Sequence, residues 1–261
     1  MNDIFTFQRF YLSIRRLMVE KGIKMMGSIL VILLVVTLLL NMQFNPGFYQ
    51  QARMMFLVMA LMFGPILYMA IVANEFTNFS KGTSYLLMPN SRFEKWLLSI
   101  LSIASYFIIF SLLFRLIDIW MINRFIDGMG ISSESIGVLE FDSDVYIIST
   151  LVGSTISMGI VLGSHYFKKN SLILSLIVMF CLLILIFFLD FIFANALIEG
   201  SIIFGDSSPF GPIYVTSLGE NPIRYSLEFD MSPIQVICAI FLPVLAGLSL
   251  IYLVRIKEKQ L

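Results

Sequence analysis

The sequence predicts an all-α polytopic membrane protein with six transmembrane helices, an N-terminal amphipathic elbow helix and both termini in the cytoplasm. Three observations support this prediction. The chain is 59% hydrophobic and only 13% charged, whereas soluble domains are about 25% charged. It contains six apolar stretches that reach or approach the length of about 20 residues that a helix needs to cross a hydrocarbon core. Its basic residues are distributed very unevenly between the segments that join these stretches.

The six stretches are residues 25–40, 54–72, 96–117, 145–164, 172–193 and 234–254. With both termini placed inside, 13 of the 17 Lys and Arg residues fall on inner segments. The remaining basic residues are Arg53, Arg115, Arg124 and Arg224, on outer segments or outer helix ends. Because Lys and Arg accumulate on the cytoplasmic side, this asymmetry predicts the orientation. We expect a single membrane domain over residues 1–261.

Residues 3–20 precede the first stretch and combine a basic face with an apolar stripe at helical spacing. The stripe is formed by Phe7, Phe10, Tyr11, Ile14, Leu17 and Met18. Such a helix is typical of the membrane interface, although packing against a soluble partner remains an alternative. We expect Gly22 to end this helix and to let the chain turn into the first span.

Residues 73–95 form the most informative inner segment. Ser91 and Glu94 have the spacing of a capping box, which predicts a defined start for the third span, with Trp96 as an interfacial anchor. Gly82 and Pro89 bracket a short piece with aromatic and aliphatic side chains. This piece could be ordinary chain lying on the membrane, or it could be a docking element for a cytoplasmic partner.

Other local signals concern the remaining spans. Gly64-Pro65 predicts a kink in the second span. Gly159-x-x-x-Gly163 predicts close helix packing, either within the chain or across a dimer seam. The short turn at residues 167–170 predicts a tight hairpin of the fourth and fifth spans. Residues 194–232 are expected to form an outer cap, with short helices near residues 198–204.

Motifs of known enzyme classes were not found. The chain has no P-loop sequence, no Gly-x-Ser-x-Gly motif and a single histidine, His165, which we expect at the membrane interface. Arg115 and Asp118 lie three residues apart and could pair along one helix face. The sequence therefore predicts no enzyme activity, no cofactor and no metal in this chain, and it contains no sign of nucleic-acid binding.

The order of these segments resembles the membrane subunits of ATP-binding-cassette (ABC) transporters of the type-2 permease class, whose fold is shared with the G-subfamily exporters. The similarity covers nearly the whole chain and is architectural. Its most motif-like part is Tyr85-Leu-Leu-Met-Pro-Asn-Ser-Arg-Phe-Glu-Lys95, which is similar to a Leu-x-x-Pro-x-Ser-Arg-x-Glu-Lys sequence in bacterial permeases.

The resemblance implies a permease subunit of an ATP-driven exporter in the bacterial cytoplasmic (inner) membrane. Two permease subunits, in a homodimer or with a related chain, would form the pathway, and two separately encoded ATPase subunits would bind ATP and Mg²⁺. Coupling to the ATPase would then involve Glu75, Tyr85, Leu86, Leu87, Arg92, Glu94 and Lys95. The pathway wall would be formed by Phe56, Met59, Phe63, Phe180, Phe187 and Phe188.

These aromatic side chains suit lipid-like or amphipathic cargo, but they could equally face membrane lipid. The substrate stays open. A non-transporting membrane scaffold or sensor with the same fold is the main alternative. An intramembrane enzyme or an ion-coupled carrier is a third, and the position of the charges near the span ends argues against a carrier.

Overall fold

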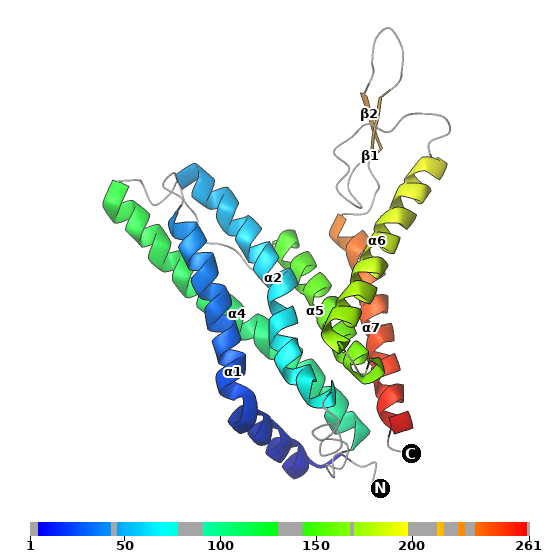
Figure 1. Ribbon diagram of the computed structural model, residues 1–261. Coiled ribbons are helices and arrows are strands. Elements are labelled where there is room, and N and C mark those ends of the chain that lie inside the picture. The colour runs from blue at the N-terminus through cyan, green and yellow to red at the C-terminus, as the bar shows by residue number, and fades with distance from the viewer. Residues whose placement is uncertain are drawn as a thin grey trace.

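The computed structural model describes residues 5–42, 46–77, 91–129, 143–167, 170–197, 213–216, 224–227 and 233–259. Six helices and one short hairpin make up this part of the chain (Figure 1). The helices are α1 (Phe7–Asn41), α2 (Pro46–Thr77), α4 (Arg92–Met129), α5 (Asp144–Tyr166), α6 (Ser171–Leu197) and α7 (Pro233–Lys259). The strands β1 (Ile213–Thr216) and β2 (Arg224–Leu227) pair antiparallel.

Each of the six predicted apolar stretches lies within one of these helices. Five helices are long and apolar enough to cross a membrane within the described residues, namely α1, α2, α4, α5 and α7. In α6, a helix of 27 residues, the described side chains include the apolar run Ser171–Ile186. The prediction of a multi-pass helical membrane protein is therefore confirmed. In residues 194–232, where the sequence predicted short helices, the described residues beyond the end of α6 form the paired strands β1 and β2.

Successive helices run in opposite directions through the bundle (Figure 1). The starts of α1, α4 and α6 and the ends of α2, α5 and α7 lie at one end of the bundle, which we call the basal end (Figure 1). We call the opposite end distal. Helix α4 runs obliquely across α1 and α2 (Figure 1). At 38 residues it is about 57 Å long, well beyond the thickness of a hydrocarbon core.

Helix α1 corrects one expectation. Gly22 does not end a separate elbow helix, because α1 is helical without interruption from Phe7 to Asn41. A glycine in a helix interior costs only about 1 kcal/mol, less than the several hydrogen bonds that a break would remove. The first turns of α1 are nevertheless inclined to the rest of the helix (Figure 1). Within the expected stripe, Phe10 is buried, whereas Phe7, Tyr11 and Met18 are exposed.

Helix α5 lies at the centre of the bundle, between α2 and α6 (Figure 1). Its glycines bring the neighbouring helices close. A β-carbon at Gly159 would lie 2.2 Å from the Met179 sulfur, and one at Gly163 would lie 1.9 Å from the Ser175 hydroxyl oxygen. Met179 and Ser175 both belong to α6. The two glycines therefore serve packing inside the chain, which is the first of the two alternatives from the sequence.

Helices α5 and α6 pack against each other as a close pair, as the sequence predicted. Helix α5 ends at Tyr166 and α6 begins at Ser171. Asn170 adopts a φ of 51°, a left-handed conformation that asparagine tolerates better than most residues. Its carbonyl oxygen accepts a bond from the Leu174 amide, which starts α6.

Helix α2 continues through Pro65. Proline has no N–H, so the carbonyl oxygen of Leu61 receives no helical hydrogen bond from position 65. Close by, the Tyr106 hydroxyl of α4 donates to the Ala60 carbonyl oxygen over 2.9 Å. A β-carbon at Gly64 would lie 1.9 Å from that hydroxyl. The glycine before the proline thus lets a tyrosine of the neighbouring helix reach the backbone of α2.

Candidate functional site

The predicted capping box is present at the start of α4. The Ser91 hydroxyl accepts a bond from the Glu94 amide over 3.2 Å, and the Glu94 carboxylate accepts one from the Ser91 amide over 2.8 Å. Both residues are buried. This reciprocal pair satisfies amides that a helix start otherwise leaves without partners. The segment that ends at residue 95 therefore leads into a well-defined helix.

The other carboxylate oxygen of Glu94 reaches α1. It accepts a bond from the Thr6 amide over 2.8 Å and lies 3.5 Å from the Arg9 guanidinium. Thr6 is the residue that precedes the first turn of α1. We call Thr6, Arg9, Ser91 and Glu94 the basal junction. It joins two helix starts that are 88 residues apart in the sequence.

Aromatic side chains surround the basal junction. The Phe5 ring contacts Phe93 at a centroid distance of 6.0 Å and Phe10 at 5.6 Å. Phe93 in turn contacts Trp96 at 5.3 Å. The Trp96 indole N–H donates to the Ser249 hydroxyl of α7 over 2.7 Å. Trp96 thus packs within the protein and connects α4 to α7. Its expected role as an anchor at the membrane interface stays a prediction.

A second group of polar side chains is buried beside this junction, between α4, α5 and α7. Lys95 is fully buried. One turn further along α4, the Ser99 hydroxyl shares a 3.0 Å hydrogen bond with the Tyr252 hydroxyl. The His165 ring packs edge-on against Tyr252 at 5.1 Å. His165 is therefore covered by neighbouring helices of the chain, and its expected depth at the membrane interface stays a prediction.

A buried ion pair lies toward the distal end. Arg53 of α2 contacts the Asp118 carboxylate of α4 at 3.2 Å, and the Tyr49 hydroxyl donates to the same carboxylate over 2.8 Å. All three residues are buried, whereas Arg115 is exposed. The spacing of Arg115 and Asp118 along one helix indicates only a pair within that helix, whereas the partners of Asp118 shown here come from α2. The available signal in the sequence was the spacing of Tyr49 and Arg53, four residues apart just before the second predicted span.

The structure places only part of the expected coupling set. Tyr85, Leu86 and Leu87 lie outside the described residues, and Glu75 is in α2 with its side chain outside the described part. Arg92 is half-buried at the start of α4. Glu94 and Lys95 are buried within the chain, so their contacts as described are with its own helices.

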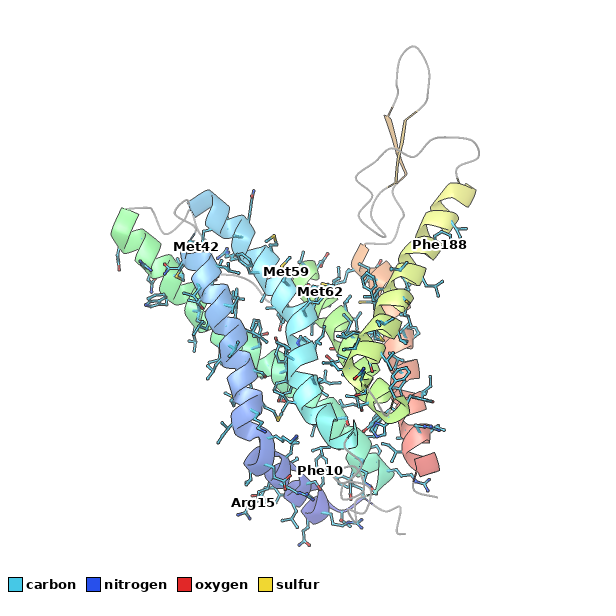
Figure 2. The ribbon with its side chains drawn as sticks, in the orientation of Figure 1. Phe10, Arg15, Met42, Met59, Met62 and Phe188 are labelled. Atoms are coloured by element: carbon cyan, nitrogen blue, oxygen red, sulfur yellow. The ribbon has the colours of Figure 1, made fainter. Side chains whose placement is uncertain are left out.

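The expected pathway residues divide into three groups. Met59, Phe63, Phe180 and Phe188 are exposed, Phe56 packs partly against the core, and the side chain of Phe187 lies outside the described part. Met59 on α2 and Phe188 on α6 lie in the distal half of the bundle (Figure 2). Within one chain, α5 separates the two helices. Met59 and Phe63 belong to a continuous exposed stripe of α2 that also contains Met55 and Leu67.

Metal-ligating side chains do not gather in the described part of the chain, where no group of three or more His, Cys, Asp and Glu residues could hold an ion. No protein-family model, no curated protein and no solved structure matches the chain. Within the described residues, the features that bear on function are the buried basal junction, the buried ion pair and the exposed apolar stripe of α2.

Proposed function

We propose that this chain is the membrane-spanning permease subunit of an ATP-driven exporter of the type-2 ABC class. In this proposal α6 crosses the membrane like the other five helices, giving six spans with both termini in the cytoplasm. The basal end then faces the cytoplasm, in agreement with the predominance of basic residues on inner segments.

The observation that carries the proposal is the construction of the start of α4. A segment with docking character, residues 73–95, runs into a helix whose first turn is held by a capping box and by α1. A rigid helix start is what a cytoplasmic partner would need in order to transmit a displacement into the membrane. Tyr85, Leu86 and Leu87 would contact that partner. The buried Glu94 and Lys95 would not touch the partner. They would act by holding α4 in place.

The exposed stripe of α2 supports a pathway at a subunit interface. Met55, Met59, Phe63 and Leu67 repeat every four residues and so occupy one face of the helix. We propose that this face meets a second permease subunit around the pathway. Flat aromatic and flexible methionine side chains would offer non-directional contacts to amphipathic cargo.

The experiment replaces Tyr85 and Leu86 by Asp and tests co-purification of the chain with a P-loop ATPase, for which a neighbouring gene is the first place to look. Anchors of this kind concentrate binding energy in a few side chains, about 2 kcal/mol or more each. We expect the ATPase to be lost, or its hydrolysis to be uncoupled from transport. The matched control replaces Asn78 and Ser80 by Asp, which adds the same charge to the segment without removing apolar groups.

Three outcomes separate the alternatives. Full transport with a normally bound ATPase in the Tyr85/Leu86 variant would show that residues 73–95 are ordinary membrane-surface chain. Failure of the unaltered chain to retain any ATPase would remove the exporter proposal. An ATPase that binds without any transport of lipid or amphipathic probes in vesicles would favour the scaffold or sensor.

A further inference from the structure

The Glu94 carboxylate is shared between two helix starts. One oxygen accepts the Ser91 amide over 2.8 Å and so caps α4, its own helix. The other accepts the Thr6 amide over 2.8 Å at the start of α1. The side chain of Glu94 is fully buried, and that of Arg9, its 3.5 Å partner, is only 29% exposed. Water therefore cannot readily take over either acceptor role.

The electrostatics favour a charge at this point. A helix start carries a partial positive charge from its unpaired amides, and a carboxylate near it is stabilising. Here two helix starts and one guanidinium converge on a single carboxylate. Hydrogen bonds to an ionised acceptor are stronger than neutral ones, and burial strengthens them further.

We propose that Glu94 is a positioning residue that fastens the start of α1 to the start of α4, so that the two move as one body. Any displacement that reaches α4 through residues 73–95 would then be passed to the inclined first turns of α1. Only this transmission of a displacement rests on the proposed function. The joint, by which we mean the attachment of the start of α1 to the start of α4 through Glu94, is a property of the fold.

Glutamine at position 94 separates the two roles of the carboxylate. A glutamine can complete a capping box with its single carbonyl oxygen. Ser91 is three residues away, whereas Thr6 is 88 residues away, so the local bond is retained more readily. In Glu94→Gln the start of α4 keeps its cap, while the Thr6 amide loses its acceptor and Arg9 loses its counter-charge.

The first measurement is hydrogen exchange of the purified chain in lipid nanodiscs. In Glu94→Gln we expect the amides of Thr6 and Phe10, which have acceptors in the structure, to exchange about tenfold faster or more, the change expected for the loss of one net hydrogen bond. The amides at the start of α4 should be little affected. The matched control Ser91→Ala removes the other half of the capping box and should reverse the pattern. Arg9→Ala should give an intermediate effect on α1.

The second measurement is the distance between two spin labels, one at Arg15 on α1 and one at Leu101 on α4, both exposed. Cys181 and Cys238 are first replaced by Ala, since both are free. We expect one narrow distance distribution in the otherwise unaltered chain and in Ser91→Ala. In Glu94→Gln the distribution should broaden. Unchanged exchange and an unchanged distance in both Glu94→Gln and Arg9→Ala would overturn the proposal, because other contacts would then hold α1.

These two measurements need no ATPase and no substrate. If α1 is released in Glu94→Gln but no ATPase ever binds the chain, the joint stands and the proposed function fails. If α1 stays fixed while transport is lost only in Tyr85 and Leu86 variants, the proposed function stands and the joint fails.

Discussion

The carbonyl oxygen of Leu61 on α2 faces Gly153 on α5 at such short range that a β-carbon at position 153 would lie 2.2 Å from it. Pro65 cannot donate an N–H to this oxygen. The close approach therefore occurs at a carbonyl of α2 that lacks its usual donor four residues ahead, and a glycine Cα–H can lie against it. The two local features, a proline on one helix and a glycine on another, form one packing arrangement at the centre of the bundle.

Replacing Gly153 by Ala should destabilise the protein by about 1–3 kcal/mol, because the new methyl group meets backbone atoms that cannot rotate away. Thermal unfolding in detergent would measure the loss. Gly27→Ala in α1 is the control, since nothing lies within 4 Å of a β-carbon there. Equal stabilities of the two variants would contradict the packing described for Gly153.

Removing one partner of the buried Arg53–Asp118 pair should cost about 3–5 kcal/mol, because the other charge is left buried and uncompensated. Asp118→Leu alone should therefore be severely destabilised. Combining it with Arg53→Met and Tyr49→Phe should restore much of the lost free energy of unfolding. The exposed pair Arg16–Glu20, at 2.7 Å, is the control, and Arg16→Ala should cost less than about 1 kcal/mol. If the loss of unfolding free energy in the triple variant equals the sum of the losses in the single variants, the three residues do not form a unit.

The packing of α5 against α6 can be tested by exchanging two small residues. Gly163→Ala alone should weaken the α5–α6 hairpin, since its β-carbon would lie 1.9 Å from the Ser175 hydroxyl oxygen and 2.7 Å from the Ser175 β-carbon. Ser175→Gly removes both atoms, so the double variant should recover stability. Oligomeric state, measured by cross-linking, should stay the same throughout. A change of oligomeric state without a change of stability would instead place these glycines at a dimer seam.

The proposed orientation predicts which sites are accessible from outside the cell. In a chain without Cys181 and Cys238, single cysteines near Asn45, Glu134 and Glu220 should react with a membrane-impermeant reagent in intact cells. Cysteines near Lys81, Lys169 and Lys257 should react only after the membrane is opened. This pattern follows from the uneven distribution of Lys and Arg. Reaction of the Lys81 site in intact cells would reverse the topology.

Features that depend on neighbouring residues could be predicted from the sequence. The capping box of Ser91 and Glu94 was identified correctly because its atoms are three residues apart. The close pairing of α5 and α6 was also predicted correctly, because a short connection leaves little choice of geometry. Gly22 was misjudged, since a single glycine weakens a helix without having to end it. For His165, its place near a span end predicted only its depth in the membrane, whereas its contact with Tyr252 of α7 depends on the packing of the helices.

By itself, the sequence determined that this chain is a helical membrane protein, where its apolar helices lie, and how the start of α4 is capped. These properties follow from composition, from runs of apolar residues and from contacts within one helical turn. Only the tertiary structure decided that Asp118 pairs with Arg53 of another helix and that Glu94 also holds Thr6. These partners are 65 and 88 residues apart. Which side chains meet across helices depends on the rotation and crossing of the packed helices, and residue spacing along one helix does not contain that information.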